Sequence, residues 1–260
     1  YFGDDNYQAS AITIFNNKLV VGISKNLYVW NIPKNTNEEN GEIQFGEIKE
    51  QYGIDLNKVD LNHGKYYEKN IQLPSSMSQV SSFAVIKSSS SNETFLAVSS
   101  PHYSVIYIYN KNYKIVSRLI SHTMGITCLK SYNFNLFSGS LDFTARMWNI
   151  KQGALEIFCD TVNQRITAIE PASYDNDVIL FTGGEDSTVQ CFNITNKKAL
   201  FEFIFNKNLV VEKISFVNDE EQKDHGKLMI ITKDTQYTPP SNRVLYKYQI
   251  HIFEFCHDIA

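Results

Sequence analysis

A short pattern of residues occurs twice in this 260-residue chain, once between Ser138 and Ile150 and again between Thr182 and Ile194. Three pairs of matching residues are each 44 positions apart: Asp142 and Asp186, Trp148 and Phe192, and Ile150 and Ile194. A fixed period of this size is typical of proteins built from one repeated supersecondary unit. The chain is therefore expected to fold as a series of similar small units.

Each repeated unit predicts four short β-strands. Small residues precede a polar turn at Asp142, and an alternating run with Thr144, Arg146 and Trp148 on one side follows it, which indicates a β-hairpin. A further strand is expected over 154–159, and the segment 165–170 repeats the pattern of 125–130. Four strands per period predict a propeller blade, and the fold class is therefore all-β.

The unit at 122–150 resembles a repeat of the WD40 family. It has His122, Ser140, Asp142 and Trp148 at related spacings, and Asn149 stands where the family usually has a second Asp. The resemblance implies a WD40-type β-propeller in which these four side chains form a buried, hydrogen-bonded structural tetrad. The chemistry is consistent with this role, because an inward-pointing carboxylate needs donors, and an imidazole, a hydroxyl and an indole N–H supply them.

The same His, Ser and Asp are also the residue types of a catalytic triad. We favour the structural interpretation, because the Gly-x-Ser-x-Gly elbow is missing and Trp148 would have no catalytic use. The unit at 165–194 keeps Asp186 but has Gly184 and Phe192 in place of Ser and Trp, so its tetrad is expected to be broken.

About five blades are visible, because weaker units are found at 11–32, 80–110 and 209–255. WD40 rings usually have seven blades, so residues 1–260 are expected to form a single but truncated or incomplete propeller domain, part of a seven-bladed ring. Donation of the missing blades by a partner is the alternative. Two insertions interrupt the period: an acidic one at 33–64 within the first visible blade, and a Pro-containing loop at 234–243.

Charge and composition disfavour several classes of function. The chain has a formal net charge of −4 and a pI near 5.9, so direct binding to nucleic acid is not expected. The insertion at 33–64 holds seven acidic residues against three lysines, so it alone carries a net charge of −4. It is interpreted either as an acidic docking loop or as a solvated loop. The sequence shows no apolar run long enough for membrane insertion.

No cofactor or metal site is predicted either. The four cysteines, Cys128, Cys159, Cys191 and Cys256, fall on or beside predicted strands without metal-binding spacing, and buried reduced thiols indicate an intracellular protein, cytoplasmic or nuclear.

The resemblance also indicates where partners would bind. In WD40 proteins the top face is built from the inter-blade loops and the turns between second and third strands, and it commonly binds peptides. These positions are Thr123, Met124, Leu141, Phe143, Gln164, Arg165, Glu185 and Ser187. Leu141 and Phe143 flank the turn at Asp142 and are either a hydrophobic anchor for a partner or packing residues of a neighbouring blade.

Three classes of function follow from these observations. The first is a non-enzymatic scaffold or adaptor that binds other proteins within a multiprotein complex. The second is a subunit of a chromatin or RNA-processing complex with indirect nucleic-acid contact. The third, an enzyme using the central channel, has no phosphate loop, metal cluster or acid pair in its support. The first is the prediction.

Overall fold

The chain folds into five antiparallel β-sheets, as seen in the computed structural model. The structure describes residues 9–32, 67–88, 93–150, 154–159, 164–174, 177–206, 208–218, 226–235 and 247–255. Within these ranges there are 19 strands and no helix. The expectation of an all-β chain with about five blades is confirmed.

Four sheets have four strands each, and the last has three. The first two sheets contain β1 (Ala11–Phe15), β2 (Lys18–Ile23), β3 (Asn26–Asn31), β4 (Tyr67–Gln72), β5 (Ser82–Lys87), β6 (Thr94–Ser100), β7 (Tyr103–Tyr109) and β8 (Ile115–Ile120). The next two contain β9 (Ile126–Tyr132), β10 (Asn135–Ser140), β11 (Ala145–Asn149), β12 (Ala154–Cys159), β13 (Ile166–Tyr174), β14 (Asp177–Gly184), β15 (Thr188–Asn193) and β16 (Lys198–Ile204). The fifth contains β17 (Leu209–Asn218), β18 (Gly226–Asp234) and β19 (Lys247–Phe255).

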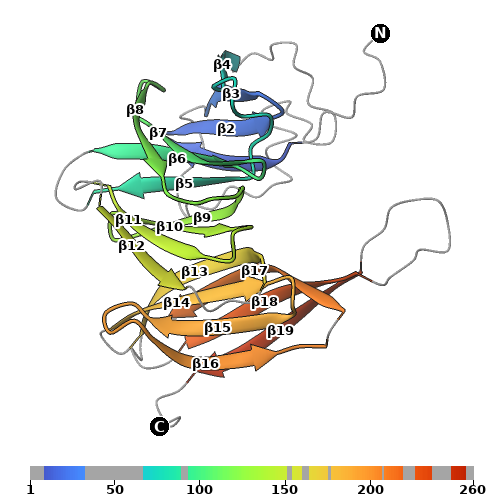
Figure 1. Ribbon diagram of the computed structural model, residues 1–260. Coiled ribbons are helices and arrows are strands. Elements are labelled where there is room, and N and C mark those ends of the chain that lie inside the picture. The colour runs from blue at the N-terminus through green and yellow to red at the C-terminus, as the bar shows by residue number, and fades with distance from the viewer. Residues whose placement is uncertain are drawn as a thin grey trace, which may run out of the picture.

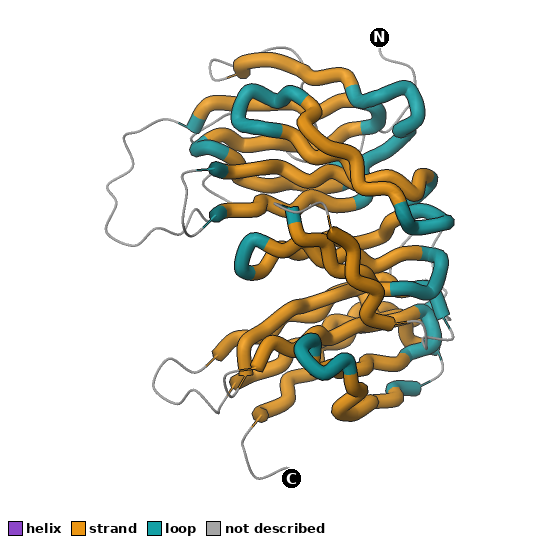
Figure 2. The backbone as a smooth tube through the Cα atoms, turned by 60° about the vertical axis from the view of Figure 1, so that its left-hand side comes forward, coloured by secondary structure: helices purple, strands orange, loops and turns teal. Residues whose placement is uncertain are grey.

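Within each sheet the strands are neighbours in the order of the sequence, and the first strand of each sheet contacts the first strand of the next. The sheets therefore follow one another as blades, with β1, β5, β9, β13 and β17 as the innermost strands (Figure 1). The first blade lies at one end of the molecule, and the fourth and fifth blades lie together towards the other (Figure 1). The N- and C-terminal ends of the chain are also far apart in the turned view (Figure 2). The described blades thus form an open array.

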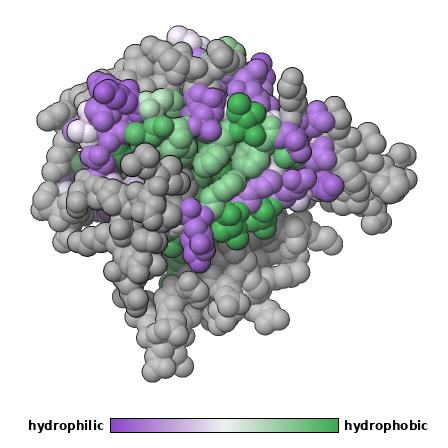
Figure 3. All heavy atoms as spheres, turned by 90° about the horizontal axis from the view of Figure 1, so that it is seen from below, coloured by the Kyte–Doolittle hydropathy of each residue, from purple (hydrophilic) through white to green (hydrophobic). Residues whose placement is uncertain are grey.

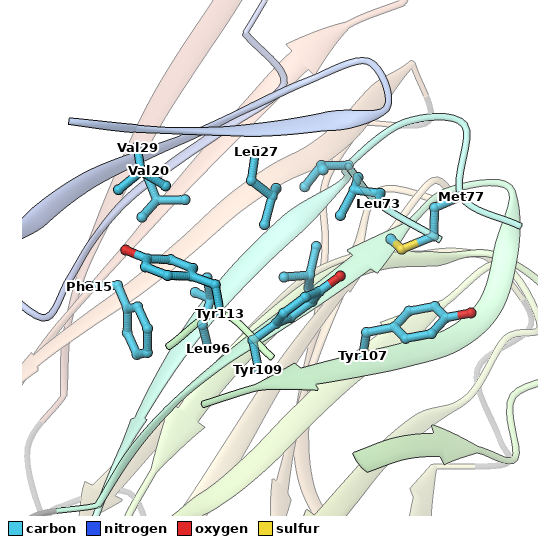
Figure 4. Close-up of a cluster of buried hydrophobic side chains, with 12 residues drawn as sticks. Phe15, Val20, Leu27, Val29, Leu73, Met77, Leu96, Tyr107, Tyr109 and Tyr113 are labelled. Atoms are coloured by element: carbon cyan, nitrogen blue, oxygen red, sulfur yellow. The ribbon is translucent and has the colours of Figure 1, made fainter. Parts of the chain in front are cut away.

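A separate apolar core fills each space between consecutive blades. Between the first two blades, Phe15, Leu27 and Leu96 pack with Tyr107 and Tyr109 (Figure 4). Further clusters lie between the second and third, third and fourth, and fourth and fifth blades. Removing this apolar surface from water is the main stabilising term, so each blade depends on its neighbours for stability.

The small residues that end the second strands have a packing role. A Cβ added to Gly139 would lie 2.5 Å from Cγ2 of Ile166, and one added to Gly183 would lie 2.4 Å from Cγ1 of Val211. Ile166 and Val211 belong to the innermost strand of the following blade. Glycine is therefore needed at these positions so that the next blade can approach closely.

Both insertions fall between strands, and most of their residues lie outside the described part of the chain. The insertion at 33–64 comes between β3 and β4, the third and fourth strands of the first blade. The loop at 234–243 follows β18, and only residues 234 and 235 of it are described. Among the described residues, no helix has the length and apolar character needed to cross a membrane.

Candidate functional site

The turn between β10 and β11 is fastened to the loop that leads into the third blade. Asp142 Oδ2 accepts hydrogen bonds from Nδ1 of His122 at 2.8 Å and from the backbone N–H of Thr123 at 2.9 Å. Its Oδ1 accepts from the backbone N–H and the hydroxyl of Thr144, at 3.0 and 2.6 Å. The backbone N–H of Leu141 also donates to the carbonyl of Gly125 at 2.9 Å. The loop and the turn therefore form one rigid unit.

The serine of the hydrogen-bonded network is Ser138, which corrects the expectation of Ser140. Ser138 Oγ lies 2.8 Å from Nε2 of His122 and accepts a hydrogen bond from Nε1 of Trp148 at 2.9 Å. Ser140 instead donates to the carbonyl of Gly125 at 2.8 Å. Both serines lie on one side of β10 because side chains alternate along a strand, and only Ser138 is far enough from the turn to meet Trp148.

One protonation state of His122 and Asp142 satisfies every hydrogen bond of the network. Burial lowers the pKa of His122, and this effect outweighs the opposing one of Asp142. A neutral His122 donates from Nδ1 to Asp142 and accepts at Nε2 from the Ser138 hydroxyl, which in turn accepts from Trp148. Burial by itself would raise the pKa of Asp142, but the hydrogen bonds from His122, Thr144 and Thr123 hold it well below its usual range.

Arg146 extends the network towards the neighbouring loop. This buried side chain donates from Nε to Oγ1 of Thr144 at 3.1 Å, and from Nη1 to Oγ of Ser121. Its Nη2 lies 4.0 Å from Oδ2 of Asp142. The positive charge of Arg146 therefore lies close to the buried carboxylate of Asp142. This accounts for an arginine on the side of β11 that also carries Trp148.

The position of these side chains does not suit a catalytic triad. The side chain of His122 has no exposed surface, Ser138 is fully buried, and only 4% of the Asp142 side chain is exposed. A nucleophile and its general base must reach a substrate, and this serine and histidine face the protein interior. Their arrangement supports a structural role.

The corresponding network of the fourth blade is reduced. Asp186 accepts hydrogen bonds from the backbone N–H and the hydroxyl of Thr188, at 3.0 and 2.5 Å. Phe192 is buried at the position of Trp148 and has no N–H to donate. The turn chemistry of the repeat is thus kept, while the indole donor is replaced by an apolar contact.

Two of the predicted partner-binding residues expose large apolar surfaces. Met124 is 44% exposed and Phe143 is 43% exposed. They lie on the two segments joined by the Leu141 and Thr123 hydrogen bonds. Phe143 also has φ of 67°, in the left-handed region that residues with a Cβ rarely adopt. Ser187, at the matching position of the next blade, has φ of 68°, so this conformation belongs to the turn of the repeat.

The candidates of the fourth blade divide into an exposed pair and a buried residue. Arg165 and Glu185 are both exposed, with Nη1 of Arg165 3.8 Å from Oε2 of Glu185, and Gln164 beside them is also exposed. Ser187 is fully buried, and its hydroxyl donates to the carbonyl of Leu209 in the next blade. The prediction that Ser187 contacts a partner is therefore wrong, because its side chain serves blade-to-blade packing.

Hydroxyl groups that connect successive blades were missed by the sequence prediction. The hydroxyl of Thr127 donates to the carbonyl of Ile166 in the next blade at 2.6 Å, and the carbonyl oxygen of Gly139 lies 3.0 Å from the same Oγ1. Thr167 makes the same two contacts with Gly183 and Val211, one blade further on. The sequence signal for these contacts is the Ile-Thr pair, which occurs at 126–127 and again at 166–167.

The remaining groups of the described residues that could bind a metal or react chemically are few. Within it, no group of three or more His, Cys, Asp or Glu side chains could hold a metal ion. Cys128 and Cys191 are free thiols, and burial raises their pKa values to about 11 and about 12. Both thiols are therefore protonated and unreactive at neutral pH.

These features define a set of β-propeller blades, the third of which carries a complete hydrogen-bonded network. The family described as "WD domain, G-beta repeat" matches residues 113–149, so the chain contains a WD40 repeat. Its fold is similar to "Structure of U3-55K" (TM-score 0.59) and "Crystal structure of RRP9 WD40 repeats" (TM-score 0.60), both with 14% sequence identity. Each similarity covers 89% of this chain, but only 62% and 61% of the two known chains. No curated protein matches the sequence. The resemblance to the WD40 family is confirmed.

Proposed function

We propose that this chain is a non-enzymatic WD40 scaffold that binds a protein or peptide partner through its top face, inside the cell. The observation that carries the proposal is the pair of exposed apolar side chains, Met124 and Phe143, on the hydrogen-bonded loops of the third blade. The exposed Arg165 and Glu185 occupy the corresponding loop and turn of the next blade and add polar groups to the proposed face.

The rigidity of these loops favours binding. Asp142 fixes the loop at Thr123 and the turn at Thr144 at the same time, so the backbone that carries Met124 and Phe143 is held in place before a partner arrives. Preorganisation lowers the entropic cost of association. Because Phe143 is 43% exposed, covering the rest of its side chain contributes about 1 kcal/mol. A central aromatic residue of this kind can dominate the affinity of an interface.

The proposal is tested by affinity capture of the full protein from lysate of its own cells, followed by mass spectrometry. The test variant carries Met124→Gln and Phe143→Asn, since asparagine tolerates the left-handed conformation of the turn. The matched control is Val116→Thr, which changes a side chain that is 51% exposed at the end of β8 away from this loop.

The proposal requires a stoichiometric partner that wild type and the Val116→Thr control capture and the double variant loses. Circular dichroism and thermal melting of the double variant establish that it is folded. A partner that the folded double variant retains would move the interface away from these loops, and turnover of any substrate at this face would contradict the non-enzymatic role.

A further inference from the structure

Two exposed aromatic side chains occupy the same position on neighbouring blades. Tyr103 is the third residue after the end of β6, and Phe143 is the third residue after the end of β10. Their side chains are 37 and 43% exposed. The equivalent residues are Asn26 in the first blade and the buried Ser187 in the fourth. Among these four blades, an aromatic residue at this turn position is therefore confined to the second and third.

The loop that carries Met124 lies between these two turns. A Cβ added to Gly125 would lie 1.7 Å from the backbone oxygen of Pro101, so glycine lets the loop rest directly on the turn of the second blade. On its other side, the carbonyl of Gly125 accepts a hydrogen bond from the N–H of Leu141 in the turn of the third blade. Three segments in contact thus carry an apolar row, which consists of Tyr103, Met124 and Phe143.

Polar residues border the apolar row on both sides. In the first blade, the turn between β2 and β3 exposes Ser24 and Lys25. In the fourth blade, the corresponding positions hold the exposed pair of Arg165 and Glu185. An apolar centre with a polar border is the usual composition of a site that binds another protein.

Exposed apolar residues on the faces of the blades have a different significance. Ile250 and Ile252 of β19 are 64 and 65% exposed. Seen from below, the end of the molecule where β16 and β19 lie in Figure 1 carries an apolar area bordered by hydrophilic side chains (Figure 3). Blades stack through their faces, so apolar strand residues are expected of the repeat itself. The apolar row lies instead on turns and a loop, and the stacking of the described blades leaves it uncovered.

We propose that the apolar row binds an extended partner segment in the polyproline II conformation, with apolar residues three positions apart. The inference rests on the proposed top-face function and adds the form of the ligand. Packed sheets lie about 10 Å apart, so the equivalent turns of the second and third blades are separated by about this distance. A segment that contacts both Tyr103 and Phe143 must place two side chains on one side at this spacing.

The polyproline II helix meets this requirement. It rises about 3.1 Å per residue with about three residues per turn, so residues i and i+3 point the same way and lie about 9 Å apart. In a β-strand, residues i and i+2 share a side but lie only about 7 Å apart. Aromatic side chains are also the groups on which polyproline II segments commonly dock, because this conformation is already extended before binding.

The test measures the binding of two synthetic peptides to the full protein by NMR. The first, Pro-Pro-Leu-Pro-Pro-Leu-Pro-Pro, has leucines three positions apart, and the matched control, Pro-Pro-Leu-Pro-Leu-Pro-Pro-Pro, has the same composition with leucines two apart. The protein is labelled with carbon-13 at its methionine methyl groups, of which there are only four. Met124→Gln assigns the signal of Met124, and the signal of the fully buried Met77 shows that each variant is folded.

We expect the first peptide to shift the Met124 signal saturably and to bind about fivefold or more tightly than the control peptide. Tyr103→Thr should weaken its binding by about fivefold, because about half of a buried aromatic contact is lost. Lys25→Gln, a polar change on the neighbouring turn, should alter the affinity by less than about twofold. Equal affinities of the two peptides, or a Met124 signal that neither peptide shifts, would overturn the inference.

A second measurement separates this inference from the proposed function. The capture from lysate is repeated with Tyr103→Thr beside the double variant of Met124 and Phe143. A partner that the double variant loses and Tyr103→Thr retains would overturn the inference and leave the proposed function intact. A partner that both folded variants retain would overturn both.

Discussion

Replacement of Ser138 by alanine tests the hydrogen-bonded network most directly. The hydroxyl of Ser138 accepts from Trp148 and contacts His122 in a site without exposed surface. Its removal loses two hydrogen bonds and leaves an indole N–H and an imidazole nitrogen unpaired, at an expected total cost of about 2–4 kcal/mol. Ser140→Ala should cost less, about 1–2 kcal/mol, because the carbonyl of Gly125 keeps the N–H of Leu141 as a donor and only the N–H of Asp142, which donates to Ser140 Oγ at 3.1 Å, is left unpaired.

The measurement is urea unfolding followed by tryptophan fluorescence. The chain has only two tryptophans, so a Trp30→Phe background makes Trp148 the sole probe and reports on the third blade. Both serine variants are compared in this background. In a double-mutant cycle, Trp148→Phe, measured by circular dichroism, should reduce the cost of Ser138→Ala by about 1 kcal/mol. The reasoning is refuted if Ser140→Ala costs as much as Ser138→Ala.

Three further predictions concern stability. Burial lowers the pKa of His122 in the folded protein, so its contribution to stability is complete above the unfolded pKa near 6.5 and is lost as the pH falls through the folded pKa. Between pH 8 and 5, the melting temperature should therefore fall less steeply in His122→Gln than in wild type. Tyr109→Phe removes a buried hydroxyl that has no partner among the described residues. Urea unfolding should therefore show equal stability or a gain of up to about 1 kcal/mol. A loss of more than about 1 kcal/mol would contradict the conclusion that this hydroxyl is unpaired. Thr127→Val removes the hydrogen bond to Ile166 in the next blade and should cost about 1–3 kcal/mol in the same assay. Thr123→Val should cost less, because Thr123 is exposed and its backbone N–H still donates to Asp142.

The repeated unit was predictable from local features of the sequence. The period of 44 residues and the alternation around Asp142 and Trp148 predicted the strands and the blade. These features are local, because strand pairing within a hairpin depends on residues close together in the chain. The contact of His122 with Asp142 was also predictable, through the family resemblance, and the structure shows it at 2.8 Å.

Which of two neighbouring residues takes each role depends on the packing of the blades against one another. Ser138 and Ser140 are equivalent in pattern, and only the position of Trp148 on the adjacent strand distinguishes them. Ser187 occupies a turn like that of Phe143, yet its hydroxyl is buried against the next blade. Such contacts join residues distant in sequence, so their outcome is set by the packing of whole blades, which local patterns do not encode.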